Sequence, residues 1–493
     1  MKVISSILIF LLSFNLISQT TTYKSNINSK RMIATVKELS SKKYMGRLPG
    51  SKEYFMAANY MLKQYKNINL KPFGDSGTYF QYVPIEYNEI QKPAKLLITN
   101  SQNKTLKNCK LGKEYIFRGF TGSGKVKAEI VFCGYGISKP ELGYDDYAGI
   151  DVKDKIVIVF KQNPKWEPKN GKFGALYTRY KANVAAERGA KAILFISLPN
   201  DEKPQPIIGS LMEGEGIQNI DLPQIHVTLS VADIIFKDVS MTLKQIQLII
   251  DSTKQTLNIK TGVYADIEAN AKYEKERLSV NVVGYMEGND PVLKDEYVLV
   301  SSHLDHVGSQ AGEVYFPGAN DNASGSAAVL EMAQYIKENN IEHKRSIIFM
   351  LYTSEEQGLI GSDFFADHSP VNVDKIIAQI NMDCIAYGDS IHIGNGKSAP
   401  ILWNHIDSID SQTSNLMIKD TWAGGGADAN GMHKKGVPAA YFVTKNSYAH
   451  LHLPTDKVNT LNVKLYENLV NLATNTVIDI TNSKYNREIV INK

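Results

Sequence analysis

Four apolar runs in the second half of the chain have the length and composition of buried β-strands. They lie at 297–300, 347–352, 376–380 and 439–443. Runs that are apolar at consecutive positions are typical of strands covered on both faces. Stretches of helical character at 327–336 and 359–366 lie between them. This alternation predicts an α/β fold with a mixed, mostly parallel sheet sandwiched by helices.

The rest of the chain divides into regions with different predicted secondary structure. Helices are expected at 32–39, 54–65 and 463–481. From residue 111 to 264, short strand-like runs accompany one helix-like stretch and predict an inserted, β-rich α+β domain. We therefore expect a discontinuous main domain, formed by residues 25–110 and 265–493.

Five metal-binding side chains follow the apolar runs or lie between them. They are His303, Asp321, Glu356, Asp383 and His452. Because the carboxyl ends of parallel strands meet at the edge where α/β sheets bind ligands, we expect these side chains to converge. Imidazole and carboxylate donors suit zinc. Five donors supply one shared carboxylate and two private ligands for each of two ions, so the sequence predicts two Zn²⁺ ions.

Two acids beside these donors are predicted to be catalytic. Asp305 follows His303 by two residues on an extended strand end, so its carboxylate is expected to accept the second ring N–H of that histidine. Glu355 and Glu356 are neighbours that point in different directions, so one ligates while the other holds a water molecule. Metal coordination acidifies that water, and we assign to Glu355 the role of general base.

The motifs around these residues resemble those of a known family. The motifs are His303-Leu-Asp305, Asp321-Asn-Ala-Ser-Gly325, Glu355-Glu356, Asn381-Met-Asp383 and His452-Leu-Pro-Thr-Asp456. Together they resemble the dizinc exopeptidases of bacterial leucyl aminopeptidase and glutamate carboxypeptidase type, which also include glutaminyl cyclase and transferrin receptor. The resemblance implies the same five ligands, with Asp321 bridging the ions, and a cis peptide between Asp321 and Asn322. Residues 111–264 resemble the protease-associated (PA) domain that many members carry as an insertion.

Two positions depart from the family's pattern. The residue before the last ligand histidine is often a tyrosine that helps to bind the oxyanion, but here it is Leu451. Tyr448 and Tyr387 are the alternatives for that role. A later Ser-Asp-His element is replaced by Ala427-Asp428-Ala429. Both changes leave the metal donors in place and affect only how substrate is positioned.

Three further side chains compete with the predicted ligands. His452 is preferred to His450 because Asp456 follows it by four residues, as in the family's pattern. We interpret His306 and His450 as polar loop residues. Cys384 lies beside Asp383 and is interpreted as a small buried residue and not as a soft ligand.

These observations lead to one functional hypothesis with several alternatives. The chain is expected to be a dizinc metallopeptidase, a hydrolase that acts as an aminopeptidase on the N-terminal residues of peptides. A metal-bridged hydroxide attacks the scissile carbonyl, with Glu355 as general base. The alternatives are a carboxypeptidase or dipeptidase, a glutaminyl cyclase, or a non-catalytic receptor-like relative. All five ligand positions are occupied, which argues against the receptor-like alternative.

The N-terminal residues indicate the compartment. Met1 and Lys2 precede an apolar stretch at 3–17, the pattern of a signal peptide spanning residues 1–18. The stretch is shorter than the roughly 20 residues of a spanning helix, so we expect a periplasmic or extracellular protein without a stable membrane anchor after cleavage. The 55 basic and 51 acidic residues are mixed along the chain, so we expect peptide substrates and no nucleic-acid partner.

Overall fold

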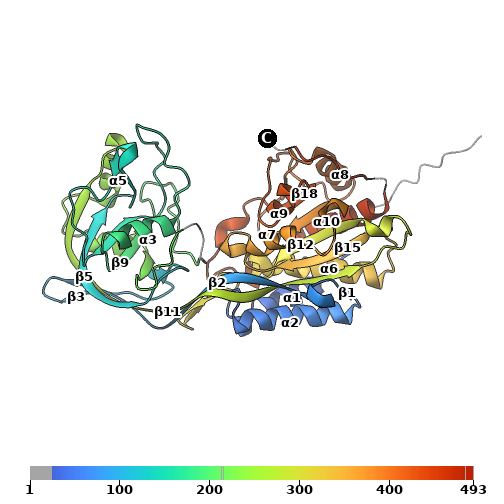
Figure 1. The fold of residues 1–493 in the computed structure, drawn as a ribbon, viewed down its shortest axis with the longest axis horizontal. Helices are drawn as coiled ribbons and strands as arrows, with labels where there is room; N and C mark the ends of the chain where they lie inside the picture. The colour runs from blue at the N-terminus through green and yellow to red at the C-terminus, as the bar shows by residue number, and fades with distance from the viewer. Residues whose placement is uncertain (1–24, 212–213, 215, 484, 492–493) are drawn as a thin grey trace, which may run out of the picture.

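The chain folds into two lobes joined by a pair of long strands (Figure 1). The computed structural model describes residues 25–211, 214, 216–483 and 485–491. The expected signal peptide, residues 1–18, lies outside the described residues. No helix in the described part of the chain has both the length and the apolar character needed to cross a membrane.

A mixed sheet forms the centre of the main lobe, with the strand order β17-β18-β16-β12-β15-β11. The strands are β11 Asn258–Met286, β12 Tyr297–His303, β15 Ser346–Tyr352, β16 Ile376–Met382, β17 Ile391–Gly394 and β18 Ala439–Thr444. β12 pairs in parallel with β15 and β16, and β16 pairs in parallel with β18. β17 and β11 run antiparallel to their neighbours. The four predicted runs are this parallel centre, so the expected mixed, mostly parallel sheet is confirmed.

Helices cover both faces of this sheet. One face is covered by α1 Ser29–Leu39, α2 Lys52–Asn67, α6 Ser324–Glu338, α8 Pro400–Ser411 and α10 Val463–Asn482, and the other by α7 Ile360–Asp367 and α9 Ala429–Lys434. Successive strand residues point to opposite faces. Val298 and Val300 pack in the first core, whereas Leu299 packs in the second. The central strands are therefore buried on both faces, which explains why their sequences show no polar alternation.

Side-chain caps fix the starts of the helices on the first face. Asn28, Ser51 and Asn462 each accept a hydrogen bond from a main-chain N–H in the first turn of α1, α2 and α10. Such a cap satisfies an N–H group that has no partner within the helix and is worth about 1 kcal/mol. These helices lie where the sequence predicted them, within a few residues at each end.

The inserted lobe extends the same sheet through the order β11-β5-β8-β9-β10-β4. Its strands are β3 Thr105–Asn108, β4 Tyr115–Phe117, β5 Gly124–Cys133, β6 Ser138–Lys139, β7 Tyr144–Asp145, β8 Ile156–Phe160, β9 Ala192–Ile196 and β10 Gln224–Val227. Its helices are α3 Thr178–Glu187, α4 Leu229–Ile235 and α5 Leu243–Thr253. Short strands of the main lobe are β1 Lys71–Pro72, β13 Ser309–Gln310 and β14 Val314–Tyr315. The inserted lobe thus holds more helix than the sequence indicated.

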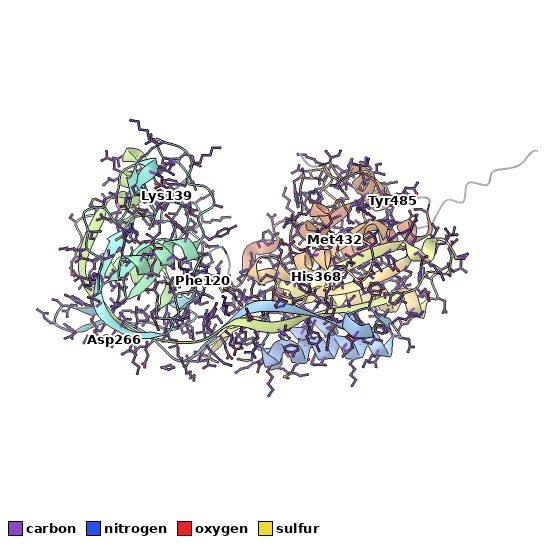
Figure 2. All side chains as sticks on the ribbon, viewed as in Figure 1. Phe120, Lys139, Asp266, His368, Met432 and Tyr485 are labelled. Atoms are coloured by element: carbon purple, nitrogen blue, oxygen red, sulfur yellow. The ribbon has the colours of Figure 1, made fainter. Side chains whose placement is uncertain are left out.

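Two strands run through both lobes. β2 (Phe80–Asn100) pairs antiparallel with β11, and the register shifts only between Glu268 and Asn270 and between Glu274 and Arg277. The inserted lobe has a core of its own, whose members range from Ile90 to Ala269. This core is wider than the expected 111–264 because it includes the distal halves of both long strands. Side chains pack densely in each lobe, with Phe120 in the inserted lobe and Met432 in the main lobe (Figure 2).

Candidate metal centre

The predicted donors meet at the carboxyl-terminal edge of the parallel strands. His303 is the last residue of β12, and Asp383 follows β16 directly. Glu355 and Glu356 form a single turn just after β15, and Asp321 lies in the turn that leads into α6. His452 lies in the loop that follows β18. The parallel pairing therefore brings all five donors to one place.

Asp321 stands between two groups of donors. In the first, His303 Nε2 lies 3.3 Å from Asp321 Oδ1 and 3.3 Å from Asp383 Oδ1. In the second, His452 Nε2 lies 3.2 Å from Asp321 Oδ2 and 2.8 Å from Glu356 Oε2. Tetrahedral zinc with ligands at about 2.0–2.2 Å places its donor atoms about 3.3 Å apart. The donor types and their spacing therefore fit zinc ligands, with one oxygen of Asp321 facing each group.

Main-chain contacts hold Asp321 in this position. The carboxylate of Asp456 accepts hydrogen bonds from the N–H groups of Asn320 at 2.9 Å and Asp321 at 3.0 Å. The peptide bond between Asp321 and Asn322 is cis, as the resemblance implied. In the sequence, Asp456 only helped to distinguish His452 from His450. In the structure, its carboxylate also binds the loop that carries Asp321.

Asp305 positions the two glutamates more directly than it positions His303. Its carboxylate accepts hydrogen bonds from the main-chain N–H groups of Glu355 and Glu356, both at 3.3 Å. The Nδ1 atom of His303 lies 3.2 Å from the main-chain oxygen of Asp305 but 3.7 Å from its carboxylate. The expected carboxylate–imidazole hydrogen bond is therefore replaced by a shorter contact with the carbonyl, because the carboxylate faces the Glu355 turn.

Burial and neighbouring charges shift the pKa values of the acidic and imidazole groups of the site. Burial alone would lower the pKa of His303, but the Asp383 and Glu355 carboxylates outweigh it and raise that pKa well above its usual range. Burial raises the pKa of Glu355 well above its usual range, and the Asp383 carboxylate adds to the effect. Burial also raises the pKa of Asp428, the acid in the altered Ser-Asp-His element, to about 7. Burial thus raises the pKa of more than one carboxyl group of the site, Glu355 among them.

His306 is a part of the site that sequence reasoning missed. It was interpreted as a polar loop residue, but its ring is fully buried and its Nδ1 atom lies 2.8 Å from Glu356 Oε1 and 3.6 Å from Asp321 Oδ2. His450 does stay outside the donor groups, and its Nδ1 atom lies 2.9 Å from the hydroxyl of Thr455. The interval of three residues between His303 and His306 was the one available signal.

Arg47 holds together the loops that carry the metal-binding residues. Its side chain is fully buried and donates hydrogen bonds to the carbonyl groups of Leu304, Pro317 and Gly318 at 2.7–2.9 Å, and to that of Leu39 at 2.8 Å. One guanidinium group thereby joins the loop of His303 to the loop of Asp321. No role was assigned to Arg47 from the sequence.

A cavity of about 570 Å³ opens onto the donors. Its wall includes Glu355, Cys384, Tyr441, Tyr448 and Leu451. The hydroxyl of Tyr441 lies 3.4 Å from Asp383 Oδ2 and 3.5 Å from the hydroxyl of Tyr448. Of the two alternatives for the missing tyrosine, Tyr448 thus lines the donor cavity.

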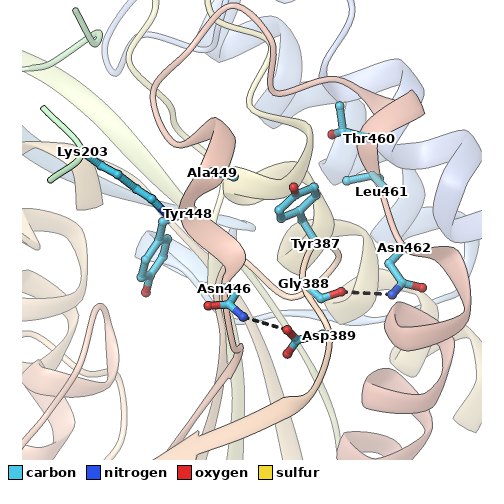
Figure 3. Close-up of a pocket in the computed structure, with 10 residues that line it drawn as sticks. All are labelled: Lys203, Tyr387, Gly388, Asp389, Asn446, Tyr448, Ala449, Thr460, Leu461 and Asn462. Atoms are coloured by element: carbon cyan, nitrogen blue, oxygen red, sulfur yellow. Dashed lines mark hydrogen bonds between the residues drawn. The ribbon is translucent and has the colours of Figure 1, made fainter. Parts of the chain in front are cut away.

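Tyr387 lies in a neighbouring cavity of about 950 Å³, which it shares with Tyr448 (Figure 3). Lys203 of the inserted lobe also lines this second cavity. Tyr387 packs against His450, with ring centroids 5.1 Å apart. The geometry therefore favours Tyr448 over Tyr387 as the group that faces a substrate.

The part of the chain that carries the donors matches a family model. Residues 281–477 match the model described as Peptidase family M28. This part of the chain belongs to peptidase family M28. It is therefore a metallopeptidase domain, a class of hydrolase.

Two curated relatives cover the chain to different extents. Aminopeptidase YwaD of Bacillus subtilis (strain 168) is 21% identical over 428 residues, covering 79% of each protein. The glutamate carboxypeptidase 2 homolog of Caenorhabditis elegans is 28% identical over 218 residues, which are 38% of this chain and 26% of that relative. The chain thus matches about a quarter of the length of the second relative.

Two solved structures share the fold over nearly the whole chain. A peptidase M28 precursor from Shewanella amazonensis SB2B aligns with a TM-score of 0.66 at 19% identity, covering 94% of this chain and 98% of that one. An aminopeptidase from Aneurinibacillus sp. strain AM-1 aligns with a TM-score of 0.63 at 20% identity, covering 92% and 93%. The mixed sheet with its helices is therefore an M28 fold.

Replacing Arg47 tests the support of the metal loops. Arg47→Met keeps most of the side-chain volume but leaves four buried carbonyl groups without their donors, so we expect a loss of unfolding free energy on the order of 3 kcal/mol. Urea unfolding of the metal-free protein measures it. Arg47→Lys keeps the charge but not the planar fork, and should recover only part of the loss. An unchanged unfolding midpoint for Arg47→Met would contradict this role.

Proposed function

We propose that this M28 peptidase is an exported dizinc aminopeptidase. The observation that carries the proposal is the pair of donor groups that share Asp321, since each group supplies imidazole and carboxylate donors at the spacing of zinc ligands. His303, Asp321 and Asp383 would hold one ion, and Asp321, Glu356 and His452 the other, with His306 beside this second group. Export rests on the signal-peptide pattern of residues 1–18.

The residues around the donors have separate tasks in peptide hydrolysis. Bound zinc supplies Lewis acidity, which polarises a carbonyl group and lowers the pKa of water. Glu355 accepts the proton of the attacking water and passes it to the leaving amine, a task for which its raised pKa suits it. Asp305 holds the main-chain N–H groups of Glu355 and Glu356 and thereby fixes the direction of both side chains. We assign to Tyr448, which lines the cavity, the stabilisation of the negative charge that develops on the carbonyl oxygen.

The charge of the cavity favours a free amino terminus. Besides the carboxylates assigned to the metal ions, the acidic side chains of Glu355 and Asp363 line it. Among the described lining residues, the cations are Lys434 and His452, and each is already paired, with Asp363 at 3.2 Å and with Glu356 at 2.8 Å. A substrate carboxylate would need an available cation, ideally an arginine. This charge pattern favours the aminopeptidase over a carboxypeptidase for acidic C-termini.

The apolar part of the wall indicates the side chain that fits. Leu359, Leu451, Tyr441 and Tyr448 line the same cavity as the donors. Such a wall stabilises an aliphatic or aromatic side chain by burying its surface, at about 25 cal/mol per Å². We therefore expect Leu or Phe at the N-terminal position of good substrates.

A substrate panel tests the proposed activity. Leucyl and phenylalanyl anilides should be hydrolysed, while N-acetylated peptides and aspartyl anilides should be poor substrates, and a chelator should abolish the activity. Rates are followed by released aniline. Hydrolysis of blocked peptides at the leucyl rate would contradict an aminopeptidase, and cyclisation of a peptide with N-terminal Gln without hydrolysis would favour the cyclase alternative.

Neighbouring glutamates provide a test of the base. Glu355→Gln should retain zinc and lose kcat by about 10³-fold, because the amide cannot accept the proton. Glu356→Gln is the matched variant, because it makes the same change at the adjacent residue. It removes a carboxylate that is assigned to the metal, so the zinc content of this variant should fall. Metal analysis and steady-state kinetics measure both. Near-normal turnover by Glu355→Gln would refute the assignment.

The inserted lobe reaches the donor cavity at two points. Tyr177 lines the cavity, and the N–H of Gly209 donates a hydrogen bond of 2.8 Å to the main-chain oxygen of His452. These contacts support a substrate-access role for the lobe that resembles a PA domain. A peptide longer than the N-terminal residue would pass beside Tyr177.

Removing the Tyr177 ring tests that role. Tyr177→Ala should raise KM for a tetrapeptide about fivefold, the worth of one aromatic contact of about 1 kcal/mol, and leave the KM of a single-residue anilide nearly unchanged. Tyr82→Ala is the control, because Tyr82 is 46% exposed against 45% for Tyr177. Equal effects of the two variants on the tetrapeptide would exclude the role.

A further inference from the structure

His306 is a buried histidine to which the proposed reaction gives no task. Its ring is fully buried and its main-chain N–H donates to the carbonyl of Arg47 at 3.3 Å. The loop opposite makes room for it, since a Cβ on Gly318 would lie 2.6 Å from the ring. The His306 ring is therefore enclosed by its own loop and by the loop of Gly318, and it points toward the metal-binding residues.

The two oxygens of Glu356 face two different imidazoles. Oε2 lies 2.8 Å from His452 Nε2, within the donor group, whereas Oε1 lies 2.8 Å from His306 Nδ1. The two imidazole rings meet edge to face, with centroids 5.5 Å apart and planes at 76°. The Glu356 carboxylate is thus held at both oxygens, by one predicted ligand and by one residue without an assigned role.

The surroundings of His306 select one tautomer. Its Nε2 atom is buried without a hydrogen-bond partner among the described residues. With the proton on Nε2, a buried N–H would lack an acceptor, and the Nδ1 lone pair would face a carboxylate oxygen at 2.8 Å. With the proton on Nδ1, the ring donates a short, charge-assisted hydrogen bond to Glu356. The second arrangement avoids both costs.

We propose that His306 is a positioning residue, whose Nδ1–H holds Glu356 Oε1 and leaves Oε2 as the single donor to the metal. The inference rests on the proposed dizinc function. Partners that orient a metal ligand in this way typically account for 10- to 100-fold in metal affinity. Because His303 and His306 share one loop, that loop supplies a ligand to one ion and orients a ligand of the other.

The experiment compares three replacements of His306 by zinc titration against a chelator. His306→Ala removes the donor and should weaken one of the two zinc sites by about 10- to 100-fold, with the other unchanged. His306→Asn carries an amide N–H close to the position of Nδ1 and should restore affinity to near the wild-type value. His306→Gln fills the space but places its amide further out, so it should behave as His306→Ala does, and it serves if the alanine variant fails to fold. His450→Ala should bind zinc as the wild type does.

The possible outcomes separate this inference from the proposed function. Wild-type affinity of both sites in His306→Ala and His306→Gln would overturn the role of His306 alone. Equal weakening in His306→Asn and His306→Ala would also overturn it, since an N–H group near the position of Nδ1 would then not be what holds the site. A wild-type protein that binds no zinc would instead overturn the dizinc centre, whatever the variants do.

Discussion

The structure depends on holding several carboxylates and imidazoles together at one edge of a sheet. Asp305, Asp321 and Asp383 are buried beside His303 and His306, and like charges so close to one another repel strongly where water is excluded. Parallel strands β12, β15 and β16 bring their ends to this edge, and the contacts of Arg47, Asp305 and Asp456 with main-chain groups keep the loops from moving apart. Bound metal ions, whose charge is opposite to that of the carboxylates, would relieve the same repulsion.

Much of the main lobe could be predicted from the sequence because its signals are local. Runs apolar at every position identify strands buried on both faces, and the capped helices begin within a few residues of their predicted starts. Four of the five donors follow such runs, and parallel pairing brings these four together. Asp321 lies instead in the turn that leads into α6. The resemblance also anticipated the cis peptide at Asp321.

The details that the sequence did not reveal depend on the direction of side chains in loops. His306 and Asp305 lie in one short loop, yet His306 faces Glu356 and the carboxylate of Asp305 faces the Glu355 turn. No periodicity governs such directions. The role of Arg47 depends on two loops that lie more than 250 residues further along the chain. The extent of the inserted lobe could not be predicted either, because β2 and β11 are continuous strands whose two halves pack in different cores.

The pairing of β2 with β11 has a consequence for the ancestry of the molecule. The chain departs from the main lobe along one strand and comes back along its immediate antiparallel neighbour, so everything between them is a detour that begins and ends at the same spot. Such a cassette can lengthen, shrink or be exchanged for another without rethreading the rest of the polypeptide. Exchange of the segment between β2 and β11 can therefore change substrate specificity without altering the metal-binding residues of the main lobe.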